Sequence, residues 1–203
     1  RLVKGATPEE RANAAQKICR RIDASQLSAA DRANADQIMG FLAEDAAALV
    51  RKTLAVTLRS SPNLPHDLAI KLSRDIESVA TPILKHSPKL TDEDLIELVL
   101  ASSPEKQVAI AERETLDASV VEVISEHGDR DAVEAAALNE GASFSDLAYD
   151  NTLKRFPSDD GVKGAVIERD RIPINVAEKL VSLVTGEMFD RLVNKHELPP
   201  QLA

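Results

Sequence analysis

The sequence predicts an all-α fold, an α-solenoid of about five short two-helix repeats with capping helices at its N- and C-terminal ends. Apolar residues are almost entirely Ala, Leu, Val and Ile, and aromatic residues make up 2% of the 203 residues. Ala and Leu favour helices, whereas aromatic residues favour strands. A phrase of apolar run, polar break and second apolar run recurs between Val79 and Leu147. Such recurrence is typical of a repeat array.

Residues 1–45 are predicted to form an N-terminal helical cap. Pro8 is allowed in a first helical turn and is followed by acidic residues, so the first helix is expected from about Pro8 to Ile22. Ser28 or Asp31 can cap a second helix. This pair matches the later repeats poorly, which is usual for terminal repeats because one of their faces meets water.

Residues 46–203 are predicted to form the repeat array and its C-terminal capping helix, as one continuous domain. Five copies align at the expected ends of their first helices, with spacings of 27, 27, 26 and 30 residues. The aligned residues are Arg59, His86, Arg113, Asn139 and Arg169. Residues 175–196 keep one apolar stripe and predict a long capping helix, bent at Gly186 and ended by Pro199-Pro200.

Local signals agree with short helices separated by turns. Thr91 and Asp94 have the spacing of a capping box at a helix start. Gly128 and Gly141 fall where helix ends favour a left-handed residue. Pro82 lies inside an apolar run, so that helix is expected to begin near Pro82 or to kink there.

Charge is concentrated in the middle of the chain. The net charge is −9, and residues 89–150 carry 4 basic and 16 acidic side chains. This segment repels a phosphate backbone and favours a partner protein with a basic surface or tail. The acidic residues at one predicted helix start are Asp92, Glu93, Asp94 and Glu97. They are either part of a binding face or simply acids favoured by the helix dipole; EF-hand spacing for a cation is absent.

The row of aligned residues has two interpretations. Equivalent positions of a solenoid line up, so the row from Arg59 to Arg169 can form a polar track for an acidic peptide or an anionic ligand. Alternatively, each residue closes the C-terminus of its own helix, where cations and amides satisfy carbonyl groups. We favour the second interpretation.

No arrangement of residues in the sequence points to catalysis, to a cofactor or to a metal. The histidines are scattered and do not form a ligand motif; they are His66, His86, His127 and His196. The single Cys19 is expected to pack in a helix and fits a reducing, cytoplasmic compartment. No apolar run approaches the ~20 residues of a membrane span, so no membrane association is expected. A triad assembled only by the fold would not be visible at this level.

Several stretches resemble known helical repeats. VAIAERETLDASVVEVISEHGD and VEAAALNEGASFSDLA are similar to leucine-rich-repeat-variant and HEAT-like repeats. The run over about residues 46–185, with its Leu-Thr-Asp-Glu-Asp-Leu turn and Ala-Ile-Ala-Glu-Arg segment, resembles the bacterial family named domain of unknown function 2336. The resemblance implies a curved stack of short helices and a bacterial setting, and it implies no reaction.

These observations lead to an expected function as a non-enzymatic helical-repeat scaffold that binds another protein, in bacterial signalling or regulation. One alternative is a nucleic-acid-binding HEAT-like module, which the acidic centre and the lack of aromatic platforms disfavour. Another is a regulatory domain of a longer multidomain protein. The sequence predicts no oligomeric state.

Overall fold

The computed structural model describes residues 7–24 and 27–198, and within these ranges the chain folds as helices and turns. The predicted all-α class is therefore confirmed. Strand-like pairing in the described residues is limited to an isolated parallel bridge between Leu116 and Ala142. Two units, residues 1–98 and 99–203, each hold most of their contacts internally, and the division falls within one helix.

The first unit begins with the two longest helices. In chain order its helices are α1 (Pro8–Ala24), α2 (Ala29–Ala43), α3 (Ala48–Leu58), α4 (His66–Ser73), α5 (Glu77–His86) and the first part of α6 (Asp92–Ala101). α1 packs on α3 and α3 packs on α5, while α2 packs on α4. Odd-numbered helices therefore form one layer and even-numbered helices the other. Cys19, Met39, Leu54 and Leu72 are fully buried in this unit.

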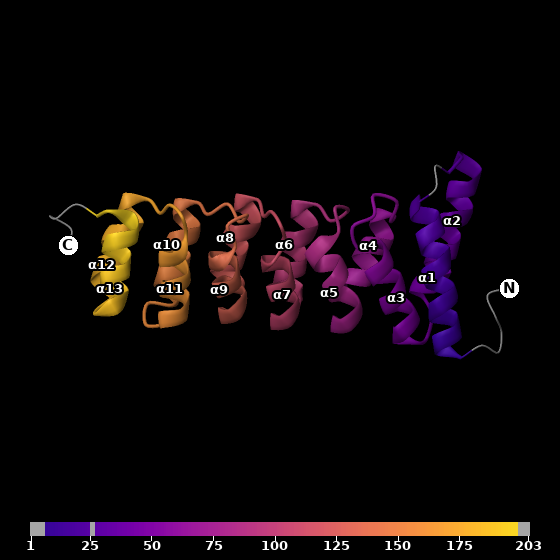
Figure 1. Ribbon diagram of the computed structural model, residues 1–203, viewed down its shortest axis with the longest axis horizontal. Helices are drawn as coiled ribbons and strands as arrows, with labels where there is room; N and C mark the ends of the chain where they lie inside the picture. Colours follow the sequence, from indigo (N-terminus) through magenta and orange to yellow (C-terminus); the bar gives the residue numbers. More distant parts are fainter. Residues whose placement is uncertain (1–6, 25–26, 199–203) are drawn as a thin grey trace. The chain divides into compact units, whose positions relative to one another are not determined.

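The second unit repeats the same alternation with helices of 8 to 10 residues. Its helices are α7 (Pro104–Ala111), α8 (Ala118–His127), α9 (Arg130–Leu138), α10 (Asp146–Arg155), α11 (Asp160–Glu168), α12 (Ile174–Leu183) and α13 (Glu187–His196). α7, α9, α11 and α13 pack in succession, as do α8, α10 and α12 (Figure 1). This packing, layer on layer within each unit, fits a solenoid-like arrangement.

Short helices of this kind are marginal in water by themselves and depend on packing. Each buries one stripe of its surface. Val120, Val121 and Ile124 of α8 are fully buried, for example, and Val176, Ala177 and Leu180 of α12 join an apolar cluster with α11 and α13. The cluster stabilises the C-terminal end of the second unit.

The capping box predicted at the start of α6 is confirmed. The backbone N–H of Thr91 donates to the carboxylate of Asp94 at 2.8 Å, and the N–H of Asp94 donates to the Thr91 hydroxyl at 3.2 Å. The predicted first cap, Ser28, is confirmed as well, since its side chain accepts from the N–H of Asp31. These two helix caps were therefore predictable from the sequence.

The helix start predicted near Pro82 and the left-handed conformations predicted for two glycines are wrong. α5 begins at Glu77, so Pro82 lies inside the helix and does not start it. Gly128 ends α8 with φ −64°, in extended backbone, and Gly141 also lacks a positive φ, because Gly186 is the one described glycine that has it. Both predicted left-handed glycines instead sit where backbone approaches closely, which the sequence pattern does not reveal.

The predicted single C-terminal capping helix is two helices. α12 ends at Leu183 and α13 begins at Glu187, with Gly186 between them at φ 59° and ψ −136°. Side chains with a Cβ rarely adopt this conformation, which explains the glycine. α13 turns back to pack on α11 and α12. It therefore takes the place of a further first helix in the odd-numbered layer. Pro199 and Pro200 lie outside the described residues.

Candidate protein-binding surface

The acidic first turn of α6 is divided between inward and outward groups. Asp92 and Glu93 are exposed. The Asp94 carboxylate instead contacts α4, where it lies 2.7 Å from Nε2 of His66. Glu97 is exposed as well, and its carboxylate lies 3.4 Å from Nη2 of Arg74, the residue that follows α4. Asp94 thus joins α4 to α6, whereas Asp92, Glu93 and Glu97 remain exposed to solvent.

The environment of Asp94 keeps it ionised. Partial burial raises its pKa, but the hydrogen bonds from His66 and Thr91 outweigh that effect and leave the pKa below its usual value. Substituting Asp94 would therefore disturb the capping box and the α4–α6 contact as well as the surface charge. Asp92 and Glu93 are the cleaner probes of this face.

The aligned residues do lie at the C-terminal ends of the odd-numbered helices. Arg59 caps α3, His86 is the last residue of α5, and Arg113 follows the cap of α7. Arg59 and His86 are exposed, and Arg113 is partly buried. Nη1 of Arg59 donates to the carbonyl of Val56 at 3.2 Å, so Arg59 closes its own helix as expected.

Asn139 and Arg169 donate to the end of the preceding odd-numbered helix rather than to the end of their own helix. The Asn139 amide donates to the carbonyls of Ala111 and Arg113 at 2.8 and 2.7 Å, which are the free carbonyls at the end of α7. Arg169 donates to the carbonyls of Ala137 and Asn139, at the end of α9, at 3.1 and 3.0 Å. These two side chains therefore link successive odd-numbered helices by hydrogen bonds.

Arg169 is inaccessible to a partner. Its exposed fraction is 7%, and its remaining donors reach the carbonyl of Ala142 at 2.7 Å and the hydroxyl of Tyr149 at 3.1 Å. The guanidinium also lies 4.6 Å from the centre of the Phe144 ring. The polar-track interpretation therefore does not extend to Arg169, whose donors are satisfied inside the protein.

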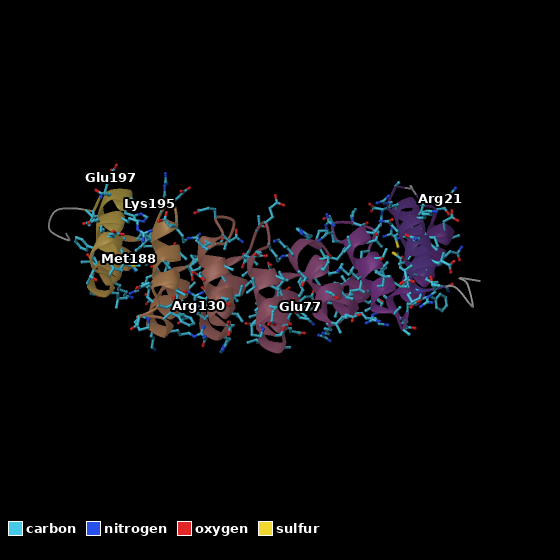
Figure 2. The ribbon with its side chains drawn as sticks, turned by 60° about the horizontal axis from the view of Figure 1, so that its bottom comes forward. Arg21, Glu77, Arg130, Met188, Lys195 and Glu197 are labelled. Atoms are coloured by element: carbon cyan, nitrogen blue, oxygen red, sulfur yellow. The ribbon has the colours of Figure 1, made fainter. Side chains whose placement is uncertain are left out.

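α13 continues the same pattern, which the sequence interpretation missed. Nε2 of His196 lies 2.9 Å from the carbonyl of Ile167, and Lys195 contacts the carbonyl of Glu168, both at the end of α11. Figure 2 labels Lys195 near the end of α13. His196 follows Arg169 by 27 residues, the spacing already seen in the row. That spacing was the signal for a further first helix.

Two successive turns of the second unit are joined by backbone hydrogen bonds. The N–H of Leu116 donates to the carbonyl of Gly141 at 3.0 Å, and the N–H of Ser143 donates to the carbonyl of Leu116 at 3.0 Å. The turn between α7 and α8 therefore lies directly beside the turn between α9 and α10. A Cβ on Gly141 would lie 1.9 Å from the carbonyl oxygen of Glu114, so this approach requires glycine.

The joined turns form an acidic surface of the second unit, which we name the acidic turn edge. Residues 112–117 hold three carboxylates and one arginine, and residues 139–146 hold two carboxylates and no cation. All five carboxylates are exposed; they are Glu112, Glu114, Asp117, Glu140 and Asp146. Asp117 also caps α8, and the N–H of Ser119 lowers its pKa. Asp117 is therefore ionised at neutral pH.

Two exposed leucines flank the second of these turns. Leu138 ends α9 with 56% of its surface exposed, and Leu147 lies in the first turn of α10 with 54% exposed. Apolar side chains beside a charged patch are typical of protein-binding surfaces, where they anchor a partner. Neither leucine was identified from the sequence, because both fit the apolar pattern of a helix core.

A series of Arg–Asp ion pairs at the N-terminal ends of odd-numbered helices was also not predicted from the sequence. The three ion pairs are Arg11–Asp45, Arg51–Asp75 and Arg130–Asp159. In each pair the arginine belongs to one first helix and the aspartate to the turn before the next. The arginines Arg11 and Arg51 are the fourth residues of their helices, a position that could have identified them.

Potential metal ligands and the single cysteine were compared with the positions that the structure gives them. No group of three or more His, Cys, Asp or Glu side chains there can hold a metal ion. Burial raises the pKa of the Cys19 thiol to about 12, so this cysteine stays protonated in the core. Within the described residues no helix is both long and apolar enough to span a membrane.

Comparison with known proteins identifies a family. The family described as "Uncharacterised protein conserved in bacteria (DUF2336)" matches residues 79–203. The match begins inside α5 and includes the joined turns and α13. Comparisons with curated proteins and with solved structures give no match.

Proposed function

The chain belongs to the bacterial family DUF2336, and we propose that it is a non-enzymatic scaffold that binds a partner protein through the acidic turn edge. The proposal includes a HEAT-like array in which five helix pairs, α3 to α12, stand between the cap α1–α2 and the final helix α13. Its setting is bacterial signalling or regulation, in the cytoplasm. The partner carries a basic surface or tail.

The observation that supports this proposal most is the way the acidic turn edge is held. Its two turns are joined by two backbone hydrogen bonds of 3.0 Å. The five exposed carboxylates therefore project from turns whose backbone is held in place, and binding to them requires little ordering of that backbone. An isolated acidic loop would lose that advantage.

The flanking leucines specify the partner further. Charge complementarity selects a basic segment and increases the association rate, whereas buried apolar contacts supply more of the affinity. Leu138 and Leu147 offer such contacts beside the carboxylates. The partner segment is therefore basic and amphipathic, with lysine or arginine on one face and apolar side chains on the other. A nucleic acid lacks the apolar face and is repelled by the carboxylates.

The experiment uses a fluorescein-labelled 14-residue amphipathic peptide with lysines on one helical face and leucines on the other. Its binding is measured by anisotropy to the wild-type chain and to a variant with Glu114→Lys and Glu140→Lys. Both glutamates are exposed and lie outside helices, so the fold should tolerate the change. We expect the affinity to fall about tenfold or more, the effect of about 1.4 kcal/mol.

A variant of equal charge serves as the control. Glu126→Lys and Glu178→Lys change the net charge identically at exposed positions of α8 and α12, outside the acidic turn edge. We expect this variant to keep affinity within about threefold of wild type at 0.15 M salt, because screening removes most long-range effects. Equal losses in both variants would show that only net charge matters, and the proposed site would be wrong.

A further inference from the structure

A groove in the first unit runs between α1 and α3. One hollow of ≈ 350 Å³ lies at the C-terminal ends of the two helices and is lined by Gln16, Arg20, Val56 and Arg59 among others. A second hollow of ≈ 340 Å³ lies at their N-terminal ends and includes Gln16 as well. Gln16 lines both hollows, so they are neighbours along α1 and α3, and together they are here named the α1–α3 groove.

The α3 wall of this groove is apolar. Leu49 and Val56 are 43% and 38% exposed. Two threonines line the same wall: the hydroxyl of Thr53 donates to the carbonyl of Leu49 at 2.8 Å, and that of Thr57 donates to the carbonyl of Thr53 at 2.6 Å. Since both hydroxyls bond within α3, the threonines add methyl groups to the wall. An occupant therefore gains by burying an apolar stripe.

The two ends of the groove carry opposite charge. Glu9 lines the N-terminal hollow, and Arg20 and Arg59 line the C-terminal one. Among the described residues neither guanidinium is ion-paired; Arg59 makes only its bond to the Val56 carbonyl. Asp23, in the same hollow, accepts from the hydroxyl of Ser61. Two arginines thus remain available for an anionic group.

The walls also decide which conformation the occupant takes. Both walls are helices, whose backbone groups bond internally, so the groove offers side chains and no backbone ladder. An extended peptide would leave covered backbone groups unpaired, at a cost, whereas a helix satisfies its own. From Glu9 to Arg20 the groove spans twelve helical residues, about 17 Å at 1.5 Å per residue. That length matches three helical turns.

We propose that the α1–α3 groove binds an amphipathic helix of a partner protein, antiparallel to α1 and α3, with acidic residues in its first turn. Helices favour acids in the first turn and bases in the last. In the antiparallel orientation the acidic turn meets Arg20 and Arg59, and the basic turn meets Glu9. The apolar stripe covers Leu49 and Val56. This mode is a helix-in-groove contact.

The inference is independent of the proposed function. The groove lies in the first unit and shares no residue with the acidic turn edge, and its charge preference at the arginine end is the reverse. Failure of one experiment therefore leaves the other interpretable.

The test uses two synthetic 14-residue amphipathic peptides of identical composition and identical leucine stripe. The first has glutamates in the first turn and lysines in the last; the second exchanges these charges. We expect the wild-type chain to bind the first peptide about tenfold more tightly in an anisotropy titration. Equal affinities, or no binding of the first peptide, would overturn the proposal without recourse to any variant.

A variant with Arg20→Glu and Arg59→Glu then locates the site. We expect it to lose the preference for the first peptide and to bind the exchanged peptide at least as well. The control Lys154→Glu, at an exposed position on α10, should leave the preference unchanged. Circular dichroism at 222 nm checks that each variant is folded.

Sedimentation of the chain alone distinguishes a second copy from a partner. If the chain self-associates and the double arginine variant is monomeric, the groove belongs to a homotypic contact and the proposal is wrong. A wild-type monomer that binds the first peptide supports it.

Discussion

The guanidinium of Arg130 holds the carboxylate of Asp159 with two parallel hydrogen bonds, Nε to Oδ2 and Nη2 to Oδ1, both 2.9 Å. Arg130, labelled in Figure 2, begins α9, and Asp159 caps α11. The same two-point geometry joins Arg11 to Asp45, at 2.8 and 2.9 Å. Successive first helices are therefore fastened by a recurring bidentate contact.

A double-mutant cycle measures how much this contact stabilises the fold. We expect Arg130→Met and Asp159→Asn to show a coupling free energy of about 1 kcal/mol in urea unfolding, because the pair is bidentate but partly exposed. Asn at position 159 keeps the helix cap that Asp159 provides to the N–H of Val162. A coupling near zero would mean that packing alone sets the contact.

The same pair predicts a pH dependence. The hydrogen bond from Arg130 lowers the pKa of Asp159 to about 2, from a usual value of 3.8. Below pH 4 Asp159 binds a proton in the unfolded chain, whereas in the folded chain it stays ionised until the pH approaches 2. The contribution of this group to stability is therefore present above pH 4 and is lost as the pH falls toward 2. The free energy of unfolding should fall less steeply between pH 4 and 2 in Asp159→Asn than in wild type. Identical slopes would contradict the assignment.

Arg169 and Arg59 occupy equivalent places in the row, but substituting them should change the free energy of unfolding by very different amounts. Arg169→Met leaves three buried carbonyl contacts and the Tyr149 contact unmade. We expect it to lower the free energy of unfolding by about 3 kcal/mol, and Arg59→Met by less than about 0.5 kcal/mol, since Arg59 is exposed. Thermal unfolding of the two variants checks this difference, and similar losses would refute the structural role of Arg169.

Two glycines give a second matched comparison. Gly141→Ala places a Cβ against the carbonyl of Glu114, whereas Gly164, inside α11, has no atom within 4 Å of its added Cβ. We expect Gly141→Ala to destabilise the chain by about 2 kcal/mol, as steric strain does. Gly164→Ala should stabilise it by up to about 1 kcal/mol through helix propensity. Urea midpoints measure both; a stable Gly141→Ala variant would contradict the joined-turn geometry.

Much of the fold was predictable because it depends on local signals. Helix composition, the Thr91–Asp94 box and the ends of first helices at Arg59, Asn139 and Arg169 all follow from residues near in sequence. The family resemblance was also confirmed, over residues 79–203. α13 was missed because its apolar stripe continues that of α12 in phase, and only the backbone angle at Gly186 separates them.

Which residues pair between neighbouring repeats could not be predicted from the sequence. The Arg–Asp pairs are separated by 34, 24 and 29 residues, so no fixed spacing marks them. The bonds from Asn139 and Arg169 to the preceding helix depend on which helix lies beside which. In the acidic site that the sequence predicted, Asp92 and Glu93 are indeed exposed. The acidic turn edge could not be predicted, because a backbone bridge between residues far apart in sequence brings its two turns together.

Hydrogen exchange with mass spectrometry tests the central claim most directly. Exchange is compared for the wild-type chain alone and saturated with the lysine–leucine peptide. The proposal predicts slowed exchange in residues 112–117 and 139–147, with little change in α11 to α13. Slowed exchange confined to other segments, or none at saturation, would contradict the acidic turn edge as the binding site.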